Sequence, residues 1–143
     1  MPQSISCAWT DEMTFTAVVD GHSLVLDADE AAGGRDKGPR PKKLILAALA
    51  GCTGMDVIYM LKKMKIRPAF FNILVDADLA ETDPKFYIDV RVRFQFAEAD
   101  RQYASNIEKA VKLSQEKYCG VAAQLKAGAK VSYEIEYLAD SQA

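Results

Sequence analysis

The sequence predicts an α+β protein in which antiparallel sheets wrap around a long central buried helix. Two observations lead to this fold class, and a third bears on the number of domains. A largely apolar run from Leu44 to Met64 has the length of a core helix and is apolar around most of its circumference. Segments before and after it alternate apolar and polar residues with the period of a half-buried strand. No repeat or linker-like tract divides the 143 residues, so we expect one domain over residues 1–143.

The first third of the chain is expected to form two strands joined by a tight turn: residues 14–20 and 23–28. The Asp20-Gly21 pair is a strong signal for that turn. A polar, glycine-rich loop follows over residues 29–40. Pro41 then marks the start of the central helix, because a proline at this position has no hydrogen bond to lose. We expect that helix to end near Lys65.

The rest of the chain is expected to form two strands, two helices and a last strand: residues 69–79, 86–96, 100–117, 121–126 and 130–138. From Phe86 to Phe96, apolar residues alternate with polar and charged ones, which indicates one core face and one wet face. The helix over 100–117 carries one buried stripe: Ile107, Ala110, Val111 and Ser114. A break near 118–120 places Cys119 at the start of the next helix.

Charge and composition narrow the class of function. A net charge of −2 and a pI near 5.4 give no electrostatic case for nucleic acid or an anionic membrane. Asp56 interrupts the apolar run, which favours a core helix over a membrane span. Without a visible secretory signal, three cysteines indicate reduced thiols in the cytoplasm. There is no CxxC pair and only one histidine, so we expect no metal and no cofactor.

Cys52 lies within the central helix, between Gly51 and Gly54. Each glycine costs about 1 kcal/mol relative to alanine in a helix interior, and a close approach by a helix or a substrate would explain that cost. A buried cysteine is usually inert, so Cys52 is either a small core residue or a reactive thiol. Cys119 is the second candidate. Free N–H groups at the start of the next helix would stabilise its thiolate. We also expect it to be exposed, as a thiol that forms a disulfide with a reactive partner needs to be. Cys7 is interpreted as incidental.

A reactive Cys52 needs a cation from elsewhere in the fold or from a second subunit. The dipole of its own helix fades within the first turn, well before Cys52. An ionised Asp56, one turn further on, disfavours a thiolate. The candidate cations are basic residues in or just after the preceding loop: Arg35, Arg40, Lys42 and Lys43.

The run from Gly33 to Ile66, with the later segment SQEKYCGVAAQLKAG, resembles the OsmC/Ohr family of osmotically inducible and organic hydroperoxide resistance proteins. Its most specific part is a P-x-x-L-x-x-A-x-x-x-x-C frame that ends at Cys52, together with a cysteine that opens a late helix, Cys119. The stretch around Cys52 is most similar to the short OsmC-like subgroup. The resemblance implies an intertwined homodimer, with the central helices in its core and two active sites at the interface.

The resemblance also implies an activity. Cys52 would be the thiolate that reduces organic hydroperoxides, with hydrogen peroxide as a further candidate, and becomes a sulfenic acid. Cys119 would resolve it as a disulfide, and a dithiol reductant would restore both thiols. In the family, a glutamate beside the helix-start proline and an early arginine activate the thiolate. Here Lys42 and Lys43 stand in the glutamate positions.

No arginine precedes Arg35 in this chain, so the family's Arg–Glu pair is absent. We hypothesise that Arg35, Arg40 or a lysine supplies the cation and that Asp56 activates the thiolate or positions the substrate. The alternatives are a weak peroxidase, or one directed at another oxidant. Two other classes stay open: a non-catalytic redox-responsive or small-molecule-binding protein, and a hot-dog-type thioesterase that uses Asp56.

Overall fold

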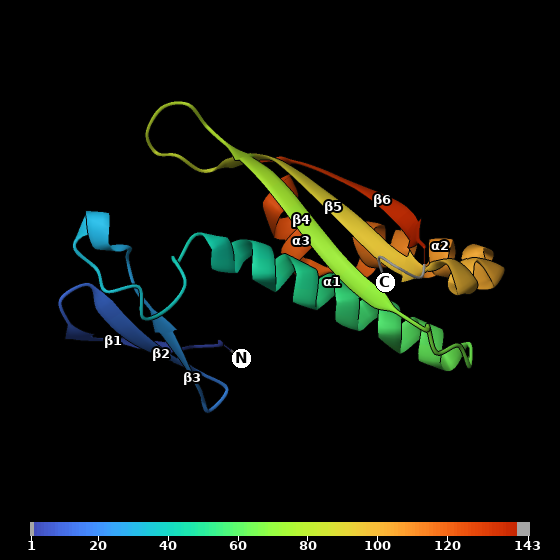
Figure 1. The fold of residues 1–143 in the computed structure, drawn as a ribbon, viewed down its shortest axis with the longest axis horizontal. Helices are drawn as coiled ribbons and strands as arrows, with labels where there is room; N and C mark the ends of the chain where they lie inside the picture. The colour runs from blue at the N-terminus through green and yellow to red at the C-terminus, as the bar shows by residue number, and fades with distance from the viewer. Residues whose placement is uncertain (1, 140–143) are drawn as a thin grey trace. The chain divides into compact units, whose positions relative to one another are not determined.

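The structure is a computed structural model and describes residues 2–139. The chain divides after Ala47 into two compact units, and helix α1 (Lys43–Lys63) begins in the first unit and continues into the second (Figure 1). Each unit has a three-stranded sheet of its own. Two sheets with interspersed helices confirm the predicted α+β class. The single domain over 1–143 spans both units and stays a prediction.

The first unit contains an antiparallel meander of three strands: β1 (Ser6–Asp11), β2 (Thr14–Val19) and β3 (His22–Leu26). Asp20 and Gly21 join β2 to β3, as predicted, with φ angles of 51° and 78°. These left-handed values match the twist of the hairpin and explain the choice of an Asp-Gly pair. A short 3₁₀ helix, η1 (Glu30–Ala32), follows in the loop.

The loop of the first unit is built around the buried carboxylate of Asp27, which is only 2% exposed. It accepts hydrogen bonds of 2.8 to 3.2 Å from three backbone N–H groups and one hydroxyl: Ala28, Arg35, Lys37 and Thr14. Burial by itself raises the pKa of Asp27, but these four donors outweigh it, and the pKa lies below its ordinary value of 3.8. A single side chain therefore fixes the path of the loop.

Two glycines let the loop lie this close to the end of β3. A Cβ atom on Gly34 would come within 2.0 Å of the Ala28 carbonyl oxygen. On Gly38 it would come within 2.1 Å of the Val25 carbonyl oxygen. No side chain fits at either position without moving the backbone.

The second unit has a sheet of three strands in the order β4 (Phe71–Leu79), β5 (Tyr87–Ala97), β6 (Lys130–Leu138). The β4–β5 pair is antiparallel, as predicted. The expectation of wholly antiparallel sheets is wrong for β6, which pairs parallel with β5. A parallel pair requires a crossover connection, and the helical elements between the two strands supply it: η2 (Glu98–Tyr103), α2 (Ala104–Leu113), η3 (Ser114–Tyr118) and α3 (Gly120–Lys126).

The core of the second unit lies on one face of β5 and under α2. The fully buried side chains of β5 alternate along the strand: Val90, Val92, Phe94 and Phe96. The predicted stripe is also buried, with Ile107, Ala110 and Val111 on α2 and Ser114 at the start of η3. The interpretation of Phe86 and Ile88 as core residues is wrong, because they are 51% and 41% exposed. They precede Asp89, where β6 begins to pair, so the sheet there has only two strands.

Helix α1 buries a narrower surface than its composition predicts. Its buried residues follow one stripe at a spacing of four: Leu49, Thr53, Val57 and Leu61. Met55 and Tyr59 are 76% and 61% exposed, so the expectation of burial on several sides is wrong for the chain by itself. The helix is long and apolar enough to cross a membrane, although core helices of soluble proteins pass the same test.

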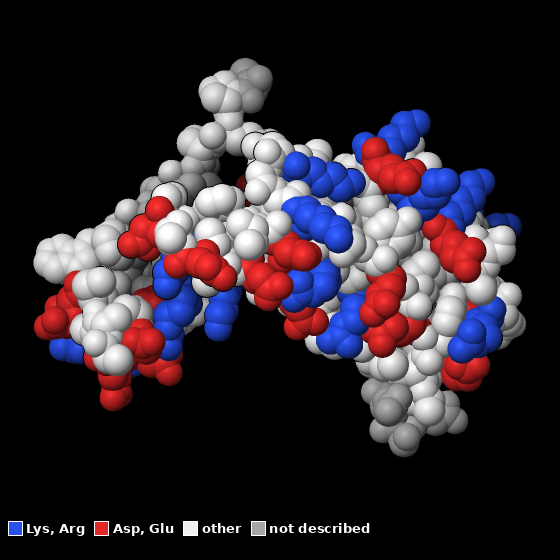
Figure 2. All heavy atoms as spheres, turned by 90° about the horizontal axis from the view of Figure 1, so that it is seen from above, with Lys and Arg blue, Asp and Glu red and all other residues white. Residues whose placement is uncertain are grey.

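Charges of both signs are interspersed over the face shown in Figure 2. Ion pairs also join β4 to β5, among them Arg91 with Asp78 at 2.9 Å and Arg93 with Asp76 at 3.1 Å. Such exposed pairs contribute little to stability. They show where the wet face of the second sheet lies.

Candidate functional site

Two of the predicted site residues, Cys52 and Asp56, lie on consecutive turns of α1. Residues four apart on a helix share a face. Both side chains are partly exposed, and Thr53, between them in sequence, is fully buried. The sequence interpretation that Asp56 shares the face of Cys52 is therefore confirmed.

Cys119 caps the N-terminus of α3, as the break near residues 118–120 predicts. The backbone N–H of Ala122 donates to the Cys119 sulfur at 3.3 Å. The expectation of an exposed, acidified thiol is wrong, because Cys119 is only 3% exposed. Burial raises the pKa of Cys119 above its ordinary value of 9.0. The Ala122 N–H lowers this pKa, but burial and the neighbouring Cys52 outweigh it.

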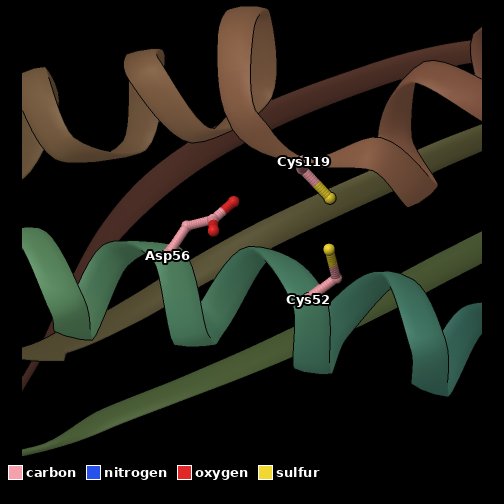
Figure 3. A group of neighbouring side chains, drawn as sticks. All are labelled: Cys52, Asp56 and Cys119. Carbon is pink, nitrogen blue, oxygen red and sulfur yellow. The ribbon is translucent and has the colours of Figure 1, made fainter.

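The fold brings Cys52, Asp56 and Cys119 together from α1 and the start of α3. The two sulfurs and a carboxylate oxygen of Asp56 all lie within 4.8 Å of one another. Figure 3 shows the two sulfurs directed toward each other, with the Asp56 carboxylate beside them on the same side of α1. We refer to these three residues as the thiol–carboxylate cluster.

A row of hydrogen bonds ends at the carboxylate of this cluster. Ser114 Oγ donates to Asp56 Oδ2 at 2.9 Å. Thr53 Oγ1 lies 2.8 Å from Ser114 Oγ, and Thr53 must be the donor because the one proton of Ser114 is already used. Gln115 Nε2 donates in turn to Thr53 Oγ1. All three bonds therefore point toward Asp56.

The turn before Cys119 is a π-helix, η3, which carries Ser114 and Gln115 of this row. The Cys119 N–H donates to the Ser114 carbonyl at 2.8 Å, and Lys126 Nζ donates to the Gln115 carbonyl at 2.6 Å. Single π-helical turns occur often at functional sites. Here the turn connects the second thiol to the hydrogen-bond row through adjacent residues.

A cavity of about 530 Å³ opens beside Asp56. Its other lining residues are mainly aromatic and apolar, with one cation: Tyr59, Met60, Lys63, Leu113 and Tyr118. Lys63 Nζ lies 4.6 Å from the centroid of the Tyr59 ring. The cavity offers space for an apolar group next to the thiol–carboxylate cluster.

The predicted cations Arg35 and Arg40 lie in the first unit, and both have acidic partners there. Arg35 pairs with Asp11 at 3.2 Å and with Glu12 at 3.6 Å. Arg40 pairs with Asp36 at 2.7 Å. Their proposed action on Cys52 stays a prediction. Cys7 is exposed on β1.

Sequence reasoning did not identify Thr53, Gln115 or Lys63 as part of the site. It did place Ser114 on an apolar stripe, and a serine there needs a buried hydrogen-bond partner. The serine on this stripe was therefore the feature of the sequence that could have revealed the hydrogen bonds to Asp56. The sequence gives no signal for Lys63, because a lysine near a helix end is usually solvated.

The fold and the cluster together define a class: α+β proteins with two neighbouring thiols, one on a long helix and one at a helix start. A sequence profile described as OsmC-like protein matches residues 34–134. The chain therefore belongs to the OsmC-like protein family, and the resemblance seen in the sequence is confirmed.

Individual relatives agree with this assignment. The chain is 27% identical over 132 residues to Protein YhfA of Escherichia coli strain K12, covering 92% of this chain and 95% of that protein. A crystal structure of a hypothetical protein from Aquifex aeolicus VF5 has a TM-score of 0.75 and 26% identity, covering 96% and 98% of the two chains.

An organic hydroperoxide resistance protein OsmC from Legionella pneumophila has a TM-score of 0.65 and 15% identity, covering 96% of this chain and 98% of that one. At this identity the likeness shows the fold alone. The OsmC-like fold predicted from the sequence is thereby confirmed.

Proposed function

We propose that the protein is a cysteine-based reductase of organic hydroperoxides in the cytoplasm. The observation that carries this proposal is the placement of two thiols from separate elements within 4.8 Å of each other. Family membership supports it, since hydroperoxide resistance proteins share the fold.

The reaction proceeds in three steps. The Cys52 thiolate attacks the outer oxygen of the hydroperoxide ROOH, the O–O bond breaks, and the products are Cys52 sulfenic acid and, after proton uptake, the alcohol ROH. The Cys119 thiolate then attacks the Cys52 sulfur, which forms the disulfide and releases water after proton uptake. A dithiol reductant finally restores both thiols by exchange and leaves as its own disulfide.

The cavity beside Asp56 supports an organic substrate. Its tyrosine, methionine and leucine side chains provide apolar contacts for the R group of ROOH. Hydrogen peroxide lacks that group and would gain nothing from these contacts. We therefore expect cumene hydroperoxide to be a better substrate than hydrogen peroxide.

The activating cation also belongs to the proposal. Arg35 and Arg40 remain our candidates, and Lys63 joins them because it lines the cavity with Asp56. Iodoacetamide alkylation of Cys52 at fixed pH measures its reactivity. The substitution that removes the activating cation, among Arg35→Ala, Arg40→Ala and Lys63→Ala, is expected to slow this alkylation, and unchanged rates in all three reject the set.

A homodimer is the proposed assembly. A groove of about 640 Å³ runs between α1 and β4, and its lining includes Gly51, Met55 and Tyr59. Apart from its two chain neighbours and the backbone of its own helix, nothing within residues 2–139 lies within 4 Å of a Cβ built on Gly51. The chain alone therefore gives no reason for this glycine in a helix, whereas a close-packed second copy would.

Size-exclusion chromatography with light scattering tests the assembly. The wild type is expected at twice the chain mass, and Met55→Glu and Gly51→Leu are expected to give folded monomers. Phe86→Glu is the matched control, because Phe86 is also an exposed apolar residue but lies outside the groove. A wild-type monomer would reject the homodimer.

Mass spectrometry after one equivalent of cumene hydroperoxide tests the chemistry. We expect a Cys52–Cys119 disulfide with Cys7 free in the wild type. In Cys119→Ser we expect a sulfenic acid on Cys52 that dimedone traps. Oxidation confined to Cys7 would contradict the proposal.

Turnover separates an enzyme from a sensor. With excess dithiothreitol, repeated consumption of peroxide is expected, whereas consumption that stops after one equivalent identifies a redox-responsive protein. Hydrolysis of an acyl thioester that is lost in Asp56→Asn but retained in Cys52→Ser would instead identify a thioesterase.

A further inference from the structure

The sequence spacing led us to expect no metal, but the fold brings three possible ligands together, and we propose that the reduced thiol–carboxylate cluster is also a zinc site, which binds one Zn²⁺ per chain through Cys52, Asp56 and Cys119. The site requires only that both thiols are reduced, so it does not depend on the peroxide chemistry proposed above. It requires no residue beyond the three that the fold already brings together.

The spacing of the ligand atoms fits this ion. Tetrahedral zinc, with Zn–S bonds near 2.3 Å and Zn–O bonds near 2.1 Å, places two sulfurs about 3.8 Å apart and sulfur and oxygen about 3.6 Å apart. In the cluster all of these atoms lie within 4.8 Å of one another. A contraction of at most about 1.2 Å, within reach of side-chain rotation, completes the geometry. Cys52 and Asp56 are four residues apart, the spacing at which a helix presents two ligands to one zinc ion.

Two of the three ligands are already oriented by hydrogen bonds. Ser114 donates to Oδ2 of Asp56, and no hydrogen bond among residues 2–139 reaches Oδ1. The N–H of Ala122 donates to the Cys119 sulfur at 3.3 Å and fixes its position. Such outer partners orient metal ligands and raise affinity. The row that ends at Asp56 therefore leaves one carboxylate oxygen available for an ion.

The donor set selects the kind of metal. Two thiolates and one carboxylate suit Zn²⁺, whereas Mg²⁺ and Ca²⁺ require oxygen ligands throughout. Three protein ligands leave a fourth position for water, and the cavity that Asp56 lines has space for it. Bound zinc would occupy the Cys52 sulfur, so the ion and the peroxide compete for the same thiolate.

The test is a titration of the reduced full-length protein with Zn²⁺ against a chromophoric zinc chelator, in a phosphine reductant that does not bind the metal. We expect one ion per chain for the wild type and for Cys7→Ser, the matched control. Each of Cys52→Ser and Cys119→Ser should weaken binding by at least about 100-fold, and Asp56→Asn by about 10-fold. Protein oxidised to the Cys52–Cys119 disulfide should bind none.

Substitution by Co²⁺ gives an independent readout, because cysteine ligands produce sulfur-to-cobalt charge-transfer absorption. We expect this band in the wild type and in Cys7→Ser, and its loss in the other two cysteine variants. Circular dichroism shows whether each variant is folded. Failure of the wild type to compete with the chelator, or equal affinity in folded Cys52→Ser and Cys119→Ser, would overturn the proposal. Peroxide turnover without zinc binding would contradict the zinc site alone. Zinc binding without peroxide turnover would contradict only the proposed function.

Discussion

Asp27 in the first unit and Asp56 in the second are both withdrawn from full contact with water, but their surroundings differ. The carboxylate of Asp27 is 2% exposed and accepts hydrogen bonds from four donors. Asp56 is partly exposed and accepts one, from Ser114. A buried carboxylate that accepts from four donors, three of them backbone N–H groups, holds the backbone in place. A carboxylate with free lone pairs, next to two thiols, is available for chemistry.

A third aspartate shows that this difference does not come from the unit in which the residue lies. Asp100, in the second unit, is 2% exposed and accepts from the backbone N–H groups of Ala69, Phe70 and Ala97. It joins the segment before β4 to the end of β5, as Asp27 joins its loop to β3. The same Asp→Asn substitution at the three positions therefore separates structural from chemical roles.

Asp100→Asn is expected to have the largest effect on stability. The asparagine nitrogen would face a backbone N–H group and leave it unpaired, so the free energy of unfolding should fall by about 2 to 3 kcal/mol. Urea denaturation followed by circular dichroism measures this. A loss below about 1 kcal/mol would show that the Asp100 carboxylate, unlike that of Asp27, does not hold the backbone in place.

Thr53→Val tests the row of hydrogen bonds while nearly preserving side-chain shape. It removes the donor to Ser114 and the acceptor for Gln115 in a buried position, so we expect a loss of about 2 kcal/mol. The matched control is Thr82→Val, at an exposed position between β4 and β5, which should leave stability unchanged. Equal losses in the two variants would show that the row contributes nothing.

Acidification tests Asp27. Because its pKa is lowered in the folded state, its contribution to stability is complete above the ordinary value of 3.8 and is lost as the pH falls through the folded pKa. The amide NMR signals of Arg35 and Lys37 should shift over that acid range in the wild type. In Asp27→Asn, they should not. Asp20→Asn, in the exposed turn, should titrate like the wild type.

Asp56→Asn is expected to have the smallest effect on stability, under about 1 kcal/mol, because the asparagine oxygen still accepts from Ser114. The thiol chemistry should respond instead. Removing a negative charge beside the sulfurs favours the thiolate, so iodoacetamide should alkylate Cys52 faster. Slower alkylation would show that Asp56 acts as a base toward the thiol.

Much of this fold follows from periodicity that is visible in the sequence. The alternation in β5, the stripe of α2 and the Asp20-Gly21 turn each predict local structure correctly. The direction of β6 was not predictable in this way, because alternation is the same for parallel and antiparallel strands. Composition alone also overstated the burial of α1, because the number of apolar residues does not show how many faces of the helix are covered within the chain.

The candidate site was predictable in part. The resemblance identified Cys52 and Cys119, and helix periodicity placed Asp56 beside the first of them. The burial of Cys119 was not visible, because it depends on how η3 and α3 pack rather than on neighbours in sequence. The roles of Asp27 and Asp100 were missed for the same reason: their donors are backbone N–H groups, which carry no sequence signature.

Ser114 holds two parts of the site at once. Its carbonyl binds the amide of Cys119, and its hydroxyl binds Asp56. If Cys119 moves to form the proposed bond with Cys52, it is expected to displace the same serine that holds the Asp56 carboxylate. The position of the Ser114 side chain should therefore differ between the reduced and the oxidised states of Cys52 and Cys119, although Ser114 takes no part in the reaction.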